Sequence, residues 1–243
     1  MGIFNVAVSG LNAAQVGILT TSHNISNAST AGYNRQQIIQ TTNIPMFTGA
    51  GFIGQGTSVE SVRRVYSQQL SEQVLSASTG AAEMDSYLSQ ISQIDNLLAD
   101  PDAGLSPALS GFFAAVQEMA AYPASLPARQ AMLSSSQALV SRFQAIDERM
   151  TEIRSGVNAQ ITSEVTAINS YAQQIAEINQ RIVLAQAVGP NQPANDLLDQ
   201  RDQLIADLNT KVRATTITQS DGTYSVFIGN GQPLVVGTLP FSM

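Results

Sequence analysis

The sequence lacks cysteine and tryptophan and contains a single lysine, Lys211. The absence of cysteine excludes disulfide bonds and thiolate metal sites. Charged residues make up 12% of the chain, about half of the roughly 25% that is usual in globular proteins. The ten arginines form no basic stripe and the net charge is −7, so the composition argues against nucleic-acid binding.

Long apolar runs are also missing. No stretch approaches the roughly 20 residues that a membrane-spanning helix needs, so we expect no membrane insertion. The N-terminus has no basic region, and its apolar residues are interrupted every two or three positions, which is unlike a Sec signal peptide. A secreted form of this protein would therefore use another export route.

The first 34 residues contain no Asp, Glu, Lys or Arg, yet they carry a regular helical pattern. Four bulky residues recur every seven positions, and a small residue follows each of them by three. The bulky residues are Phe4, Leu11, Ile18 and Ile25, and the small ones are Ala7, Ala14, Thr21 and Ala28. This alternation predicts a helix over residues 3–28 that packs closely on another helix. Because such a helix is marginal alone in water, we interpret these eight residues, the seam, as an assembly interface.

Polar and Gly-rich stretches divide the next part of the chain. The run from Asn24 to Asn34, which includes Gly32, predicts the end of the first helix. Residues 35–64 are rich in Gly and Pro and are expected to be extended or hairpin-like. A second helix is predicted from about 65 to 98, because apolar residues recur at spacings of three or four. These residues are Tyr66, Leu70, Val74, Ala77, Ala81, Met84, Leu88, Ile91, Ile94 and Leu98.

Two further helices follow a break at residues 100–104. A short helix is predicted with Ser106 as its N-cap and Pro107 at its first position. The longest helix is predicted over about 127–188, with one apolar register from Phe143 to Val157 and another from Ile168 to Ala185. Four extra residues between the registers form a stutter. Apolar stripes of this kind usually form the internal core of a protein, and the helices predicted between residues 65 and 188 can pack on one another in this way.

The last part of the chain changes from helix to strand. After a break at 189–193, a helix is predicted with Asn195 or Asp196 as its cap. From residue 212 the apolar residues alternate as in strands, with turns at 220–222 and 229–231. Strands with open edges seldom stand alone, so we expect the start of an outer β domain.

The predicted fold class is mainly α. We expect an elongated helical bundle or coiled coil with an uncharged N-terminal assembly helix, an extended or hairpin segment, and the start of a C-terminal β domain. The four predicted segments are 1–34 (assembly helix and motif), 35–64 (hairpin linker), 65–211 (long-helix rod) and 212–243 (beginning of the β domain).

No catalytic, cofactor-binding or metal-binding pattern stands out. His23 has no carboxylate near it in sequence and fits a polar residue at a helix end. Asp196, Asp199 and Asp202 could form a metal-binding face, but beside Arg201 at a helix start they more often match the helix dipole and make surface pairs. The Gly-rich fragments do not continue into a phosphate-binding loop. We therefore predict no enzyme activity, no cofactor and no metal.

The N-terminal region carries a specific motif. Ser9-Gly10-Leu11 is followed by Asn24-Ile25-Ser26-Asn27-Ala28 and then by Thr30-Ala31-Gly32-Tyr33. This order and spacing resemble the N-terminal motif of bacterial flagellar axial proteins of the rod, hook and hook-associated group. The segment from Gly54 to Tyr66 is similar to the segment that follows the motif in that group.

A second motif selects one family within the group. Asn195-Asp196-Leu197-Leu198-Asp199 continues to Arg201-Asp202 and resembles the hook-associated protein 1 family, which forms the hook–filament junction. Members of that family end in a second amphipathic helix that pairs with the first. The sequence after Gly237 cannot form such a helix, so we expect this chain to be the N-terminal portion of a longer protein.

The resemblance implies a structural role with defined partners. The protein would be secreted unfolded through the flagellar type III export apparatus, with an export chaperone, and would lie outside the cell. A ring of its copies would join the hook protein to the second junction protein. The alternatives are another flagellar axial protein (hook, rod or second junction protein) and a helical translocator or adhesin of a type III secretion system.

Overall fold

The computed structural model describes residues 3–99, 104–189, 192–229 and 231–243. They group into two compact units, one of residues 1–79 with 166–243 and the other of residues 80–165. Residues 100–103 and 190–191 of the predicted breaks at 100–104 and 189–193, and residue 230 of the last predicted turn, lie outside the described residues. The predicted four-segment division stays a prediction beside this grouping.

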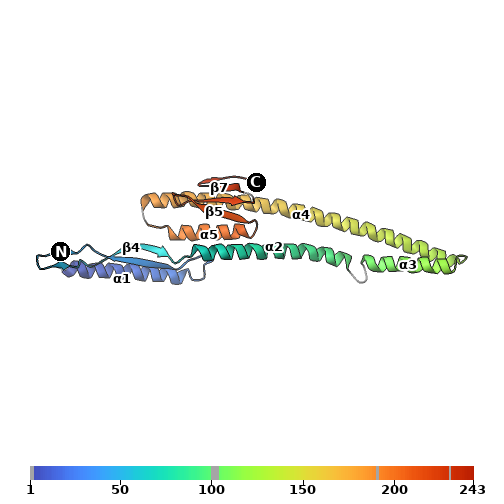
Figure 1. The fold of residues 1–243 in the computed structure, drawn as a ribbon, viewed down its shortest axis with the longest axis horizontal. Coiled ribbons are helices and arrows are strands. Elements are labelled where there is room, and N and C mark those ends of the chain that lie inside the picture. Colours follow the sequence, from blue (N-terminus) through green and yellow to red (C-terminus); the bar gives the residue numbers. More distant parts are fainter. Residues whose placement is uncertain (1–2, 100–103, 190–191, 230) are drawn as a thin grey trace. The chain divides into compact units, whose positions relative to one another are not determined.

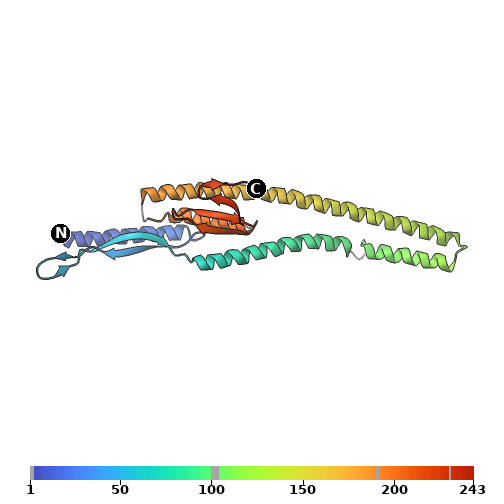
Figure 2. The same cartoon turned by 45° about the horizontal axis from the view of Figure 1, so that its top comes forward.

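The first unit begins with helix α1 (Ile3–Ser26), which lies along a hairpin (Figures 1 and 2). Strands β1 (Gln36–Thr42) and β4 (Thr57–Arg64) pair antiparallel, with Gln36 opposite Arg64 and Thr42 opposite Thr57. The short strands β2 (Met46–Phe47) and β3 (Phe52–Ile53) pair near the tip. The structure therefore confirms the predicted helix and hairpin, with the helix ending at Ser26, two residues before the predicted end at residue 28.

The core of this unit lies between the second half of helix α4 (Leu126–Val188), helix α5 (Asn195–Asn209) and an antiparallel sheet. The sheet has the order β5-β6-β7-β8, from strands β5 (Ala214–Thr218), β6 (Tyr224–Ile228), β7 (Gln232–Val236) and β8 (Leu239–Pro240). The buried apolar residues of this core are Ile168, Ala172, Ile175, Ala176, Ile205, Leu208, Val226, Ile228, Leu234 and Val235. The second predicted register of the long helix thus supplies the buried face of α4.

Helix α2 (Gln68–Leu98) has the predicted extent but turns its apolar stripe outward. Leu70 and Val74 are 62% and 66% exposed, and Met84 and Leu88 are similarly exposed. The opposite face carries the buried Thr79, which donates a hydrogen bond to Leu75 O (2.8 Å) and approaches Asn209 Oδ1 (3.4 Å). The expectation that such stripes pack inside the protein is therefore wrong for α2.

Two predicted helix caps are also wrong. Helix α3 (Leu105–Ala121) begins one residue before Ser106, its N-cap is Gly104, and no side chain caps it. Pro107 is accommodated because the first N–H groups of a helix have no partner within the helix. The N-cap of α5 is Ala194, again without a side-chain hydrogen bond. The Asn195 side chain instead donates a hydrogen bond to Val62 O of β4.

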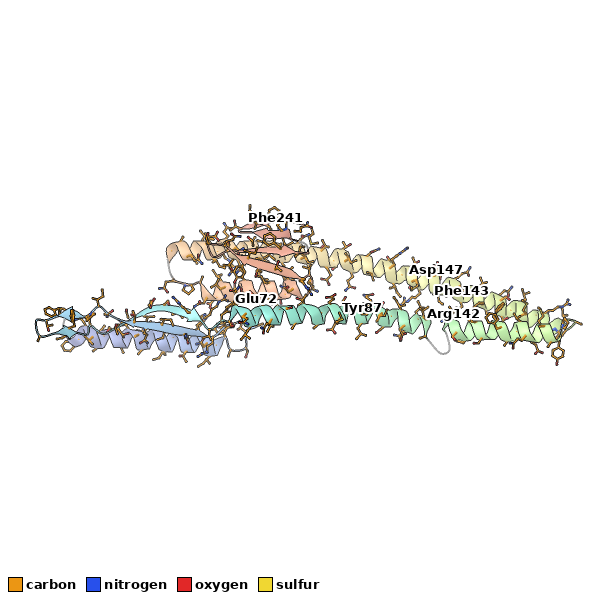
Figure 3. All side chains as sticks on the ribbon, viewed as in Figure 1. Glu72, Tyr87, Arg142, Phe143, Asp147 and Phe241 are labelled. Atoms are coloured by element: carbon orange, nitrogen blue, oxygen red, sulfur yellow. The ribbon has the colours of Figure 1, made fainter. Side chains whose placement is uncertain are left out.

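The second unit contains helical segments of α2, α3 and α4 with few buried residues. Ala128 is the only buried apolar residue that the structure describes in this range. Aromatic side chains such as Tyr87 on α2 and Phe143 on α4 are 64% and 49% exposed (Figure 3). The fold is mainly α, as predicted, and none of its described helices is long and apolar enough to cross a membrane.

Candidate assembly interface and motif junction

Seven of the eight seam residues lie on the outer face of α1, and Ala28 lies in the turn that follows the helix. Phe4 is 80% exposed, Leu11 and Ile18 are each 68% exposed, and Ile25 is 73% exposed. The small seam residues are exposed as well: Ala7, Ala14, Thr21 and Ala28. Among the described residues, no element covers this face, so its apolar side chains remain in contact with water.

The opposite face of α1 packs on the hairpin through small and polar residues. Ala13 is buried, and the Ser9 hydroxyl accepts a hydrogen bond from the Thr57 N–H (3.2 Å) while donating one to Val6 O (2.7 Å). Gly56 has a positive φ of 86° and leaves no room for a Cβ beside Ser9. Ser9 of the N-terminal motif therefore fixes the helix to β4.

The rest of the N-terminal motif ends α1 and fixes the start of β1. Asn24 Oδ1 accepts hydrogen bonds from the Tyr33 hydroxyl and the Gln36 N–H, each 2.7 Å long, and its Nδ2 donates to Gln36 O (2.8 Å). Asn27 donates to His23 O (3.0 Å), and the Thr30 hydroxyl donates to Asn27 Oδ1 (3.3 Å). These contacts replace the hydrogen bonds that the helix end lacks.

Gly32 lets this turn approach α5. Its φ of 75° lies in the left-handed region, and a Cβ there would fall 2.8 Å from Gln203 Cβ. Glycine is thus required for both its backbone conformation and its lack of a side chain. By contrast, a Cβ at Gly10 would meet open space, and Gly10, like Leu11, is exposed.

The second sequence motif meets the first at α5. The buried Asp199 carboxylate accepts hydrogen bonds from the Asn34 N–H (2.9 Å) and from Asn34 Nδ2 (2.8 Å), and pairs with the Arg64 guanidinium at 2.9 Å. The same guanidinium nitrogen lies 2.6 Å from Asp202 Oδ2. We call this group the polar junction; its members are Asn34, Gln36, Arg64, Asp196, Asp199 and Asp202.

Asp196 completes the junction on its more exposed side. Its Oδ1 accepts a hydrogen bond from Gln36 Nε2 (2.7 Å) and lies 3.2 Å from His23 Nε2. His23, which has no carboxylate near it in sequence, therefore gains one through the fold. The expectation that the three aspartates make surface pairs beside Arg201 is wrong for Asp199 and Asp202, because Arg64 of the hairpin is their partner.

Other residues of the second motif have structural roles. Asn195 is buried and donates to Val62 O of β4 (2.8 Å), which explains why it does not cap α5. Arg201 is buried, donates to Gly222 O (2.7 Å) and lies 3.4 Å from the centre of the Tyr224 ring. Leu197 and Leu198 are half-buried.

The charges of the junction follow from burial and proximity. Burial raises the pKa of the Asp202 carboxyl, the Arg64 charge opposes this, and the neighbouring Asp199 adds to the rise. Burial acts to lower the pKa of Arg64, but the two carboxylates outweigh it and raise the pKa. The guanidinium therefore stays charged and is shared by two carboxylates.

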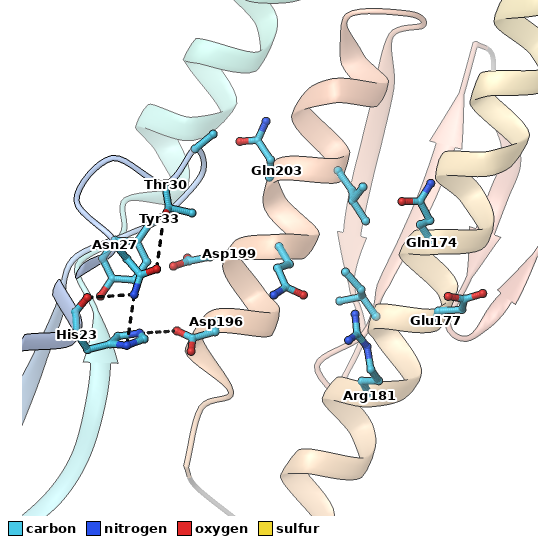
Figure 4. Close-up of a pocket in the computed structure, with 14 residues that line it drawn as sticks. His23, Asn27, Thr30, Tyr33, Gln174, Glu177, Arg181, Asp196, Asp199 and Gln203 are labelled. Carbon is cyan, nitrogen blue, oxygen red and sulfur yellow. Dashed lines mark hydrogen bonds and ion pairs between the residues drawn. The ribbon is translucent and has the colours of Figure 1, made fainter. Parts of the chain in front are cut away.

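A pocket of about 530 Å³ opens beside the junction (Figure 4). It is lined by the end of α1 and the turn after it, by α5 and by α4, including His23, Tyr33, Arg181, Asp196 and Gln203. Burial raises the pKa of the Tyr33 hydroxyl, and the nearby Asp196 and Asp199 charges add to this. Within the part of the chain that the structure describes, no group of three His, Cys, Asp or Glu residues could hold a metal ion.

Comparison of this chain with known protein families shows which family it belongs to. Residues 91–243 match the model of the flagellar hook-associated protein FlgK helical domain. The chain belongs to the FlgK family. Residues 4–34 match the flagella basal body rod protein model, so both motif resemblances found in the sequence are confirmed.

Individual FlgK relatives extend the match over nearly the whole chain. Flagellar hook-associated protein 1 of Salmonella typhimurium is 39% identical over 97% of this chain and 43% of its own length. The Bacillus subtilis protein of that name is 28% identical over 94% and 48%, respectively. The flagellar hook junction protein FlgK from Burkholderia pseudomallei superimposes with a TM-score of 0.61 at 36% identity, covering 70% of this chain and 30% of that one. The chain thus spans less than half the length of the curated relatives cited here.

Sequence reasoning missed the main partner of the second motif. Arg64 follows Arg63 in a dipeptide that is too small to mark a basic cluster, and Asn34 and Gln36 differ from their neighbours in no way that a pattern could detect. The one available signal was its position, because Arg64 lies within the segment from Gly54 to Tyr66 that resembles the flagellar group. The separation of 135 residues between Arg64 and Asp199 is what hid the pair.

Proposed function

We propose that this chain is a structural part of the flagellum at the hook–filament junction and that it self-assembles through the seam of α1. The observation that carries the proposal is the exposure of all eight seam residues, seven on α1 and Ala28 in the turn after it, in a segment without charged side chains. The names of its FlgK relatives support the location.

Burial of the seam supplies the driving force for assembly. Covering a bulky apolar side chain contributes about 1.5–3 kcal/mol, and the seam offers four of them in a row. Copies with a net charge of −7 repel one another, but contacts through α1 bring no charged side chains together. Helices of neighbouring copies would supply the apolar surface that covers the seam.

The partners follow from this role. A ring of copies would join the hook protein on one side to the second junction protein on the other. The chain would reach this extracellular site through the flagellar type III export apparatus with an export chaperone. Addition of the purified protein to isolated bare hooks would separate this role from that of a hook, rod or second junction subunit, because only the first junction protein should bind there directly.

A double substitution on the seam tests the proposal. Leu11→Asp with Ile18→Asp places two charges on the exposed seam, and in the gene that encodes this sequence we expect loss of motility and of junction formation. The circular dichroism spectrum of the variant should remain that of a helical protein, because neither side chain contributes to the core. The matched control, Asn5→Asp with Asn12→Asp, adds the same charge to exposed positions beside the seam and should keep motility. Normal motility of the seam variant would refute the proposal.

A further inference from the structure

The tip of the hairpin, residues 44–53, is an exposed apolar ribbon. Five apolar side chains point into water there, with exposed fractions between 44% and 89%: Ile44, Met46, Phe47, Phe52 and Ile53. No Asp, Glu, Lys or Arg occurs between residues 36 and 59. A two-stranded ribbon is at best marginally stable alone, and an exposed apolar patch of this kind marks an interaction site.

Contacts between its two strands and within its turn close the tip. Met46 pairs with Ile53, and Phe47 pairs with Phe52 with ring centroids 5.3 Å apart. The turn closes through hydrogen bonds from the Thr48 N–H and Thr48 hydroxyl to Gly51 O, each 3.0 Å long. These contacts reduce the conformational entropy that the tip loses on binding.

A groove of about 360 Å³ lies at the other end of the hairpin, where the turn after α1 meets α2, α5 and strands β5 and β6. Apolar and aromatic side chains line much of it: Tyr66, Leu70, Val74, Leu75, Ile205 and Tyr224. Leu70 and Val74 are among the exposed residues of the α2 stripe. The two acids at the groove already have partners, since Glu72 accepts from Gln68 (2.9 Å) and Asp202 pairs with Arg64. An uncharged occupant therefore leaves no new charge unpaired.

The tip cannot reach this groove in its own copy. Gly32 and Asn34 of the groove directly precede β1, whereas Phe47 lies eleven residues beyond Gln36 along the hairpin. At about 3.3 Å per residue this separates tip and groove by roughly 36 Å. Figures 1 and 2 show the tip and the start of α2 at opposite ends of the hairpin. A contact between the two surfaces must therefore join two molecules.

We propose that the hairpin tip of one copy inserts into the groove of the next copy. The contact is heterologous, since different surfaces of identical chains meet, and such contacts generate rings or helical arrays. The inference rests on the proposed self-assembly and adds a second contact to it, distinct from the seam. Phe47 and Phe52 are the knobs, and Leu70 and Val74 form the wall that receives them.

Disulfide trapping tests the contact cleanly because the chain has no cysteine. Phe47→Cys in one preparation and Leu70→Cys in another, mixed at high concentration under mild oxidation, should form a mixed dimer. The control replaces F47C by Gln37→Cys, which is exposed on the same hairpin near its root. We expect roughly tenfold more mixed dimer than in the control, the ratio that about 1.4 kcal/mol of binding free energy gives.

Two results would overturn the proposal: equal yields with F47C and Q37C, or a higher yield when F47C is mixed with Leu11→Cys, which would place the tip on the seam. The seam experiment distinguishes this failure from that of the proposed function. If L11D/I18D abolishes motility while F47C and L70C do not cross-link, assembly through the seam stands and only the tip contact is rejected. If F47C and L70C cross-link while cells that carry L11D/I18D swim normally, the tip contact stands and the seam proposal is rejected.

Discussion

Asp199 is the residue on which the polar junction depends most. Its carboxylate accepts two hydrogen bonds from Asn34 and pairs with Arg64, so it ties together the end of the N-terminal motif, the root of the hairpin and α5. Buried charges and donors of this kind are costly to leave without partners. A single carboxylate therefore links segments that are more than a hundred residues apart in sequence.

We expect Asp199→Ala to destabilise the fold strongly. The change leaves the Asn34 donors without an acceptor, and Arg64 keeps only Asp202 as a partner. The free energy of unfolding should fall by about 3 kcal/mol. Urea denaturation followed by circular dichroism measures it. Asp85→Asn, at an exposed position of α2, is the control and should change the free energy by less than about 0.5 kcal/mol. Equal effects of the two variants would contradict the role of Asp199.

At the scale of elements, α1 and the hairpin form one packed pair. The helix presents small residues such as Ala13 inward and bulky ones outward, which is the reverse of an ordinary amphipathic helix. The close approach depends on Gly56, where the chain has a positive φ and no space for a side chain. The seam stays exposed because the hairpin covers only the small-residue face.

Two glycine substitutions should act in opposite directions. Gly56→Ala introduces strain at a positive φ and a clash with Ser9, and should destabilise α1–hairpin packing by about 1–3 kcal/mol. Gly10→Ala is made at an open position within α1, and should stabilise the helix by about 0.5–1 kcal/mol. Thermal melts of both variants provide the measurement. A melting temperature that Gly56→Ala leaves unchanged would show that the close approach to Ser9 contributes little.

At the scale of the whole molecule, burial is distributed unevenly. Residues 1–79 and 166–243 contain the apolar core around Ile175 and Leu208, whereas in residues 80–165 the described buried apolar side chain is Ala128. Segments with few buried contacts open locally at low free energy. The long helix α4 thus crosses from a region with little burial into the core.

Hydrogen exchange should follow this division. We expect backbone amides of α3 and of the first half of α4 to exchange faster than those of α5 and of the second half of α4. Mass spectrometry of peptides along α4 gives the comparison within one helix. Uniform protection along α4 would contradict the expectation and would indicate that another surface covers residues 80–165.

The sequence by itself determined the elements. Helix periodicity, glycine-rich turns and β alternation located α1, α2, α4, the hairpin and the terminal strands, because these signals are local. The register from Ile168 to Ala185 identified the buried face of α4 for the same reason. The α2 stripe misled, since spacing shows that apolar residues share a face but not whether that face meets a partner in the same chain.

Only the tertiary structure decided what these elements do together. Arg64 and Asp199, 135 residues apart, form a buried pair that no local pattern marks, because ion pairing depends on distance in space. Packing against the hairpin leaves Asp199 buried and Asp202 half-buried, where surface positions were expected. Asn195 donates to Val62 O of β4 and does not cap α5. The spacing of bulky and small residues in the sequence thus identified the seam as a surface that needs a partner. The fold decided that the hairpin covers the other side of α1, so the seam stays exposed.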